Sequence, residues 1–319
     1  MGENDKKIKF VVQTEDKNER IDKFLFKQNI GLSRNKIQKL INLGRVKVNG
    51  KIVTTKNFSL SACDIIEINN LLVDEEPISY KPQNIDIKIL YEDDYLIAIS
   101  KEPGLVVYPG IGHKENTLLN ALIHYDNKLS GMESELRAGI VHRLDKDTSG
   151  IMLIAKTPRI HELLSEEFKQ RQVSKKYVAL VLGNFKEEAG IIDMPIGRSK
   201  KDRKKMGVAF NGRNSISEFK VLEQFDDCAL LEIYPKTGRT HQIRVHFSFI
   251  GHPIIGDKNY GNKETEKIAK EIGLSRQFLH SKGIKFIHPV SGESVEIIDE
   301  LSDDLEHALN ALKKLKTYQ

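Results

Sequence analysis

Apolar side chains recur at helical spacing in two short segments near the start of the chain. Ile21, Phe24 and Leu25 are spaced i, i+3, i+4, and the segment 33–44 repeats this pattern between Ser33, an expected N-cap, and its final glycine. The alternating stretch RVKVNGKIV follows, and its central Asn-Gly pair is the strongest short signal for a β-hairpin. The pattern therefore predicts two short helices and a hairpin in a small N-terminal unit.

Later segments mostly show the apolar runs that are typical of buried strands. Four such runs are LIAIS, IMLIAK, YVALVLG and CALLEIY, and helical patterns occupy 117–125, 158–171 and 302–316. Strands outnumber helices and do not alternate regularly with them. We therefore predict an α+β fold with a mixed, largely antiparallel sheet and flanking helices rather than a doubly wound sheet.

A stretch with two prolines, VDEEPISYKPQNI, separates these two parts and has the weak apolar periodicity of an interdomain linker. The chain has 319 residues, which is more than one typical domain. We therefore predict an N-terminal domain at 1–75, a linker at 76–85 and a larger domain at 86–319.

The composition is that of an ordinary soluble globular protein. It is 39% hydrophobic and 30% charged, and no apolar run approaches the ~20 residues that a membrane span needs. The opening residues lack a signal-peptide pattern, so we expect a cytoplasmic protein with no membrane partner. Cys63 and Cys228 lie too far apart for a CxxC zinc site, and we expect both to be small apolar fillers. Nothing in the sequence calls for an oligomer, so we expect a monomer.

Charge is distributed unevenly along the chain. Residues 19–51 hold nine Lys or Arg against two acids, residues 198–213 hold seven against one, and residues 293–306 hold seven acids without any Lys or Arg. This distribution is typical of a protein that binds a polyanion such as RNA, although ordinary solvated lysines would explain either basic segment alone. The expected RNA contacts are Arg20, Arg34, Lys36, Lys39, Arg45, Lys47, Lys201, Arg203, Lys204 and Lys205.

The stretch HRLDKDTSG is enclosed by two apolar runs, so it must form a connection close to the sheet. Its Thr-Ser-Gly end has the chemistry of a turn that folds onto its own backbone. Asp145 and Asp147 share a face in an extended chain and diverge in a turn. The spacing alone therefore allows a catalytic carboxylate here, and equally a carboxylate that only caps the turn.

A second dense segment begins KTGRTHQIRVHF. Apolar residues repeat at helical spacing from Ile243, after Thr240 as a credible N-cap, while the alternation in QIRVHF leaves a strand open. Arg244 departs from the apolar stripe in either case. His241 and His246 are five residues apart, which is a poor spacing for metal ligands on a helix, so we expect no metal.

The residues RIDKFL, SRNKIQKLI, GRVKVNGK and DIIEI resemble the S4 RNA-binding domain. The resemblance covers residues 19–68 and implies a basic helical face that meets structured RNA. One position departs from the usual pattern, because Cys63 stands where a glycine is common before Asp64. We expect the turn into the last strand to differ slightly there.

Four motifs of the chain are similar to those of the RluA family of pseudouridine synthases. In chain order they are KEPGLVVYPG, HRLDKDTSG, KKYVALVLG and GRTHQIRVHFSFIGHPIIGD. The resemblance extends from about residue 19 to 290. It implies isomerisation of uridine to pseudouridine in RNA without a cofactor, and 23S ribosomal RNA as the substrate, since S4-bearing members include enzymes of the large subunit. The resemblance leaves open which uridine is modified, and the choice of rRNA over tRNA depends on the resemblance alone. KEPG and Tyr108 depart from the commoner KPxG and His, which affects loop shape near the site.

The resemblance also assigns roles position by position. Asp145 matches the essential aspartate, Arg143 the arginine that displaces the target base, and Tyr177 the tyrosine that stacks on uracil. Arg244 matches the arginine that pairs with the aspartate, and Ile243 the aliphatic residue beneath the ring.

The chemistry requires an ionised carboxylate near C1′ of the ribose. Asp145 must be charged whether it attacks C1′ or removes a sugar proton, and the sequence leaves both routes open. Burial drives a carboxylate toward its neutral form, and a guanidinium such as that of Arg244 opposes this. For Asp147 we expect a structural role.

Two other classes of protein would leave different patterns in the sequence. A non-catalytic S4 protein that only binds ribosomal RNA would show erosion at Asp145, Tyr177 or Arg244, and all three are intact. A nucleoside or glycoside hydrolase would need paired carboxylates at the bond and no S4-like module.

Overall fold

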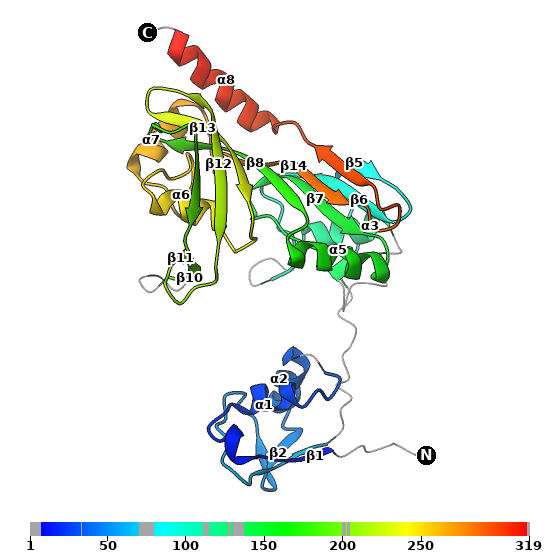
Figure 1. Cartoon of the computed structure of the whole chain (residues 1–319). Coiled ribbons are helices and arrows are strands. Elements are labelled where there is room, and N and C mark those ends of the chain that lie inside the picture. The colour runs from blue at the N-terminus through cyan, green and yellow to red at the C-terminus, as the bar shows by residue number, and fades with distance from the viewer. Residues whose placement is uncertain are drawn as a thin grey trace. The chain divides into compact units, whose positions relative to one another are not determined.

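The computed structural model of the chain describes residues 8–32, 34–69, 80–110, 115–126, 129, 137–199, 202 and 205–317. They form two compact units, Met1–Pro77 and Ile78–Gln319 (Figure 1). Within these ranges every helix is too short or too polar to span a lipid bilayer.

The N-terminal unit packs two helices against a four-stranded antiparallel sheet. The helices are α1 (Ile21–Lys27) and α2 (Arg34–Asn42), and the strand order is β1-β4-β2-β3. Their apolar stripes are buried against Val46 and Val48 in one core, as the helical spacing predicted. Ser33, the expected N-cap of the second helix, lies outside the described residues. The remaining elements are β1 (Ile8–Val11), η1 (Thr14–Asp16), β2 (Val46–Val48), β3 (Lys51–Val53) and β4 (Ile65–Ile68).

Cys63 is exposed, so its expected role as an apolar filler is wrong, whereas Cys228 is buried. Cys63 has a φ of 64° and occupies the left-handed region that favours glycine. The chain therefore makes the turn into β4 with a left-handed residue at the surface, where a side chain has no core to fill.

The larger unit is built on a nine-stranded sheet whose main path runs β5-β6-β7-β14-β8-β13-β12-β9, with β15 paired to β14. Only the β7–β14 pair is parallel, so the sheet is mixed and largely antiparallel, and the α+β prediction is confirmed. The strands are β5 (Lys88–Glu92), β6 (Leu96–Lys101), β7 (Ser149–Ala155), β8 (Ser174–Leu182), β9 (Ala189–Asp193), β12 (Ile216–Gln224), β13 (Cys228–Pro235), β14 (Leu279–Ile287) and β15 (Ser294–Ile298). A separate two-stranded sheet joins β10 (Ile196–Arg198) and β11 (Met206–Val208).

Helices flank this sheet at both ends. Figure 1 shows α6 and α7 at the β12–β13 half and α3 and α5 at the β6–β7 half. The helices are α3 (Leu118–Tyr125), α5 (Pro158–Gln170), α6 (Gln242–Phe249), α7 (Lys263–Glu271) and α8 (Asp303–Thr317), with a short 3-10 turn η3 (Arg137–Gly139). The segment QIRVHF is therefore a helix, which settles the alternative that its sequence left open.

Two residues of the predicted linker bond to α3. Asn120 Nδ2 donates to the carbonyl of Lys81 at 2.9 Å, and the backbone N–H of Gln83 donates to the carbonyl of Asn120 at 3.1 Å. This part of the predicted linker therefore packs as part of the larger unit.

The sheet order brings distant segments of the chain together. Ser281 of β14 pairs with Gly150 at the start of β7 on one side and with Tyr177 of β8 on the other. A Cβ added to Gly150 would lie 2.4 Å from the carbonyl oxygen of Ser281, and its φ is 110°. Glycine therefore permits the close approach at the end of HRLDKDTSG, and this approach places that loop beside β8.

Candidate active site

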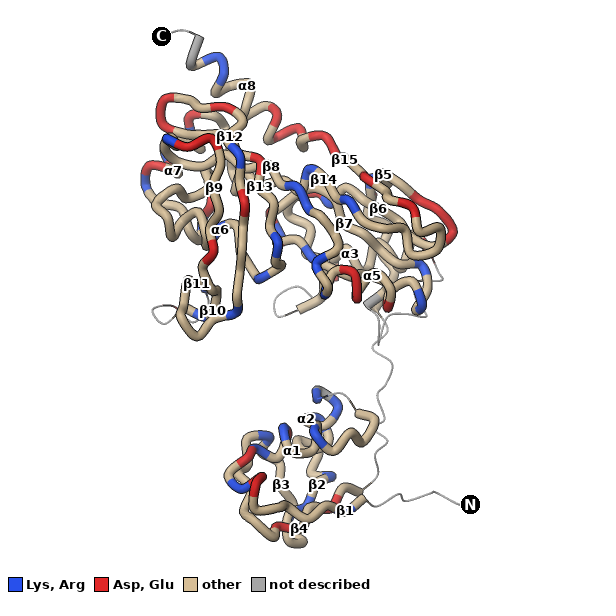
Figure 2. Tube along the Cα trace, viewed as in Figure 1, with Lys and Arg blue, Asp and Glu red and all other residues tan. Residues whose placement is uncertain are grey.

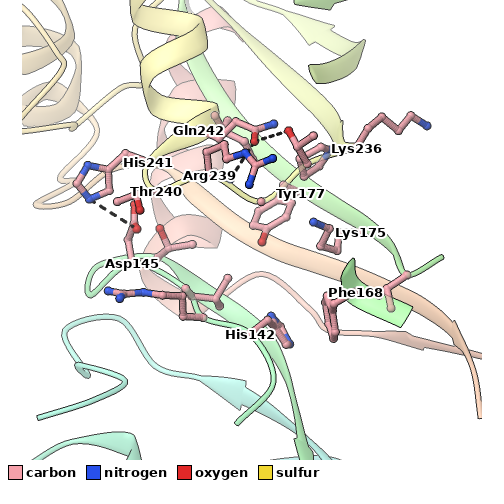
Figure 3. A pocket seen from close by; sticks show the side chains of 18 of the residues that line it. His142, Asp145, Phe168, Lys175, Tyr177, Lys236, Arg239, Thr240, His241 and Gln242 are labelled. Atoms are coloured by element: carbon pink, nitrogen blue, oxygen red, sulfur yellow. Dashed lines mark hydrogen bonds and ion pairs between the residues drawn. The ribbon is translucent and has the colours of Figure 1, made fainter. Parts of the chain in front are cut away.

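A cavity of about 530 Å³ opens between the loop before β7, the strand β8 and the loop before α6 (Figure 3). Among the described residues that line it, Asp145 is the single carboxylate. The lining is otherwise strongly basic, which suits a polyanionic substrate. Its basic side chains are Arg143, Lys169, Arg171, Lys175, Lys236, Arg239 and Arg244.

Asp145 lies in the turn that precedes β7. Its carbonyl accepts a hydrogen bond from the backbone N–H of Thr148 at 3.1 Å, so the turn predicted from the sequence is present. Its side chain is 20% exposed, and Arg244 Nη1 donates to its Oδ2 at 2.9 Å. The expected pair is thus formed between residues 99 positions apart in the chain.

Arg244 binds a second carboxylate that the sequence reasoning missed. Its Nε and Nη2 lie 2.7 and 2.8 Å from the two oxygens of Asp257, and its guanidinium lies 5.1 Å from the centre of the Tyr260 ring. A lysine could not serve both carboxylates in this planar geometry. Asp257 ends the quoted motif GHPIIGD, so an acid following a buried segment was the available signal.

Arg244 and Asp257 each stabilise the charged form of the other. Burial favours the neutral form of Asp257, but the hydrogen bond and charge of Arg244, with two backbone N–H groups, hold its pKa below the ordinary value. Burial also opposes the charge of Arg244, yet Asp257 and Asp145 together raise the pKa of that guanidinium. Arg244 therefore stays charged at the buried end of the cavity, next to Asp145.

Tyr177 and Ile243 line the cavity from two different elements. Tyr177 lies on β8 and packs against the cores on both sides of the strand. Burial raises the pKa of its hydroxyl to about 12, with Asp145 adding to the rise, so the ring is neutral at physiological pH. Ile243 is 6% exposed in the first turn of α6. Arg143, two residues before Asp145, is exposed at the same cavity.

A buried lysine supports the loop of Asp145 from behind. Lys101, in the KEPG segment, donates from Nζ to three main-chain carbonyls and is fully buried. Burial lowers the pKa of its ammonium to about 7. The accepting carbonyls are those of Glu102 at 2.7 Å, Leu105 at 3.0 Å and Lys146 at 2.9 Å.

Arg276 holds the other end of the same loop. Its Nη1 donates to the carbonyl of Asp147 at 2.9 Å, while its Nε lies 2.6 Å from Asp304 at the start of α8. Asp147 thus contributes a main-chain carbonyl to the structure of the turn. Figure 2 shows that this start of α8 belongs to the acidic stretch that runs on from β15.

Lys175 and His142 both line the cavity, and the His142 ring stacks on Phe168 at 4.6 Å between ring centres (Figure 3). Burial lowers the pKa of His142 to about 3, and its Nε2 accepts from the backbone N–H of Leu153 at 2.8 Å. Burial also lowers the pKa of Lys175 to about 8. Among the described residues, Lys175 has no hydrogen-bond or ion-pair partner.

His241, the N-cap of α6, and His246, within α6, do not share a site. His246 is buried and bonds to the hydroxyl of Ser217 and the carbonyl of Met194, each at 3.0 Å. His241 instead lies 3.8 Å from Asp145. It is the N-cap of α6 with a φ of 56°, so the predicted N-cap at Thr240 was wrong by one residue.

In the N-terminal unit, two of the expected RNA contacts are held by a buried acid. Asp22 is fully buried, and it accepts hydrogen bonds from Arg20, Arg34 and Gln38. The side chains of Arg20 and Arg34 remain 40% and 43% exposed. Asp22 therefore holds two arginines at the surface in fixed positions.

The other expected RNA contacts are more dispersed. Lys36 and Lys39 lie on α2, with Lys39 exposed, and Arg45 is half-buried before β2. Lys47 pairs across the sheet with Glu67, on the face opposite the buried Val46 and Val48, so it lies away from the helices. Lys205 donates to the carbonyl of Asn259 at 2.6 Å. Lys201, Arg203 and Lys204 lie outside the described residues.

Comparison with known proteins agrees with this geometry. A family model described as RNA pseudouridylate synthase matches residues 95–249, and an S4 domain model matches residues 19–66. The uncharacterized RNA pseudouridine synthase YlyB of Bacillus subtilis is 39% identical over 96% of this chain and 98% of its own length. Ribosomal large subunit pseudouridine synthase D of Zymomonas mobilis is 36% identical over 90% of this chain and 92% of its own.

The fold is also found among solved structures. Human RNA pseudouridylate synthase domain containing 4 aligns with a TM-score of 0.56 at 27% identity, over 71% of this chain and 93% of that chain. The family match, the relatives and the basic cavity around one carboxylate agree. The chain belongs to the RluA family of RNA pseudouridine synthases and carries an N-terminal S4 domain.

Proposed function

We propose that this pseudouridine synthase modifies uridine in large-subunit ribosomal RNA, with Asp145 as its catalytic carboxylate. The observation that carries the assignment of Asp145 is its contact with Arg244 inside the basic cavity. Relatives named ribosomal large subunit pseudouridine synthase D support the choice of RNA. A hydrolase would require a second carboxylate across the bond, and Asp145 is the single acid among the described lining residues.

The reaction cuts the bond from N1 of uracil to C1′, turns the base within the site and joins C5 to C1′. Asp145 acts as an anion, either on C1′ or on a sugar proton. Arg244 donates to Oδ2 of this carboxylate and is itself fixed by Asp257. Arg244 leaves the other oxygen, Oδ1, free.

The target base must leave its stack to reach this carboxylate, at a cost of about a few kcal/mol. Arg143 is exposed two residues before Asp145, where it can fill the space that the base leaves. Tyr177 then receives the uracil, and stacking returns roughly 1–3 kcal/mol. Ile243 supports the ring from α6. The base, seated against these two side chains, displaces the water that would hydrolyse the intermediate.

Substitution of Asp145 by Asn tests the catalytic assignment. Asn keeps the size of the side chain and removes its charge, so pseudouridine formation should be lost while RNA binding persists. The measurement is pseudouridine mapping in 23S rRNA after incubation with each protein, alongside a filter-binding titration. Appreciable turnover by the Asn variant would sink the assignment. Mapping rRNA and tRNA from cells with and without the gene decides the substrate class, and unmodified rRNA would exclude the proposed one.

A further inference from the structure

His241 lies beside the oxygen of Asp145 that Arg244 leaves free. Its Nε2 is 3.8 Å from Oδ1, and Figure 3 shows the ring pointing at this carboxylate. His241 caps α6 in the left-handed conformation, which is uncommon for a residue with a side chain. It precedes Arg244 by three residues, so both side chains project from the same end of the helix toward Asp145.

The hydrogen bonds behind His241 determine where its proton lies. The hydroxyl of Tyr260 accepts from the backbone N–H of Met206 at 3.1 Å, and it lies 2.8 Å from Nδ1 of His241. Burial raises the pKa of Tyr260, so this hydroxyl keeps its proton, and among the described residues Nδ1 of His241 is the acceptor within its reach. A neutral imidazole that accepts at Nδ1 carries its own proton at Nε2, on the side of Asp145.

Burial keeps the imidazole ring of His241 neutral. Burial lowers the pKa of His241, and the positive charges of Arg244 and Arg143 act in the same direction. Asp145 and Asp257 act against them, yet the pKa remains below its ordinary value. At neutral pH the ring is therefore a hydrogen-bond donor without a charge, and it does not compete with Arg244 as a counter-ion.

We propose that His241 is a positioning residue, which donates from Nε2 to Oδ1 of Asp145 and is held in this tautomer by Tyr260. The contact closes from 3.8 Å when RNA fills the cavity, since catalytic hydrogen bonds tighten in the substrate complex. Arg244 and His241 then fix the carboxylate at both oxygens and set its angle to the ribose. Met206 begins β11 within the basic segment 198–213, so the Tyr260 hydroxyl links this segment to His241. This inference rests on the catalytic role proposed for Asp145.

The tautomer is measured without any substrate. In the full chain labelled with ¹⁵N-histidine, long-range ¹H–¹⁵N correlation spectra distinguish the two neutral tautomers, and His241→Gln assigns one of the ten histidine signals. We expect the Nε2–H form in the wild type. Tyr260→Phe removes the donor to Nδ1, so the tautomers should mix and the pKa of His241 should rise. An Nδ1–H form in the wild type, or an unchanged spectrum in Tyr260→Phe, overturns the proposal.

Single-turnover kinetics on a 23S rRNA transcript then test the consequence. His241→Ala should slow pseudouridine formation by about 100-fold, the scale expected for a misplaced catalytic group, at unchanged RNA affinity. His241→Gln, which retains a donor, should recover part of this loss, and His124→Gln at an exposed position is the matched control. Tyr260→Phe should move the acid limb of the pH–rate profile upward. Equal rates for the wild type and His241→Ala overturn the proposal. A wild type without activity on this RNA instead refutes the proposed substrate, and the spectra still decide the tautomer.

Discussion

Replacing Asp257 by Asn removes the negative charge that holds Arg244 in its buried position. The carboxylate is fully buried and accepts two hydrogen bonds from the guanidinium, at 2.7 and 2.8 Å. Breaking a buried ion pair by removing one partner costs about 3–5 kcal/mol. Asn retains one acceptor oxygen, so we expect a loss of about 3 kcal/mol in the free energy of unfolding, at the lower end of that range.

The loss is measured by urea unfolding followed by circular dichroism. With a denaturant dependence of about 3 kcal/mol per molar urea, the midpoint should fall by about 1 M. Asp94→Asn, at an exposed carboxylate in the turn between β5 and β6, is the matched control and should leave the midpoint unchanged. Activity should fall as well, by about 100-fold, because Arg244 no longer fixes the angle of Asp145.

The pH dependence gives a second check on the same substitution. The folded-state pKa of Asp257 lies below its ordinary value of 3.8, so its ionisation stabilises the fold above that pH. This stabilisation is lost as the pH falls through the lowered folded-state pKa. The stability gap between the wild type and Asp257→Asn should therefore be full at pH 7 and close in acid. Equal midpoints at pH 7, or a gap that does not change with pH, would refute the reasoning.

Three further substitutions or deletions have expected outcomes. Lys175→Met should raise the unfolding temperature at pH 7, because burial lowers the pKa of this lysine to about 8 in the folded protein, and it should weaken RNA binding. The advantage of the variant over the wild type should shrink as the pH rises from about 8 toward 10.5, and a variant that is less stable at pH 7 would contradict this. Lys101→Met should lower the unfolding temperature and the turnover rate at constant RNA affinity, because three main-chain carbonyls lose their donor. An unchanged turnover rate would show that Lys101 does not support the Asp145 loop. Deleting residues 1–77 should weaken RNA binding. The slope of the logarithm of the binding constant against the logarithm of the salt concentration should become less steep by about 0.7–0.9 for each lost phosphate contact. An unchanged slope would show that this unit binds something else.

The positions of most elements followed from the local pattern of the sequence. The apolar spacing after Thr157 predicted the helix that the structure has at Pro158–Gln170, with Thr157 as its N-cap. The Asn49–Gly50 pair lies between β2 and β3 as expected. The errors were local too: Thr240 is not the cap of α6, because His241 adopts the left-handed conformation, and Cys63 is exposed for the same backbone reason.

The candidate site was predicted only in part. The resemblance of the motifs named Asp145 and Arg244, and the structure brings them within 2.9 Å. The sequence did not mark three residues that contact Asp145, Arg244 or the loop around them, namely Asp257, Lys101 and His241. Asp257 and His241 contact side chains that lie earlier in the chain, and Lys101 contacts main-chain carbonyls, so no local pattern indicates them. Arg276 binds the main-chain carbonyl of Asp147, and Asp145 rather than Asp147 is among the described residues that line the cavity.

The sequence by itself determined where helices and strands form, since those depend on short-range backbone sterics and on the spacing of apolar side chains. It also determined the set of groups available for chemistry. Only the tertiary structure decided which of them meet, because β14 enters the sheet between β7 and β8 and brings Asp145 and Tyr177 into one cavity. The tertiary structure also fixed the charge states of Asp257 and Arg244, because the cost of desolvating them is met only where both lie within hydrogen-bonding distance.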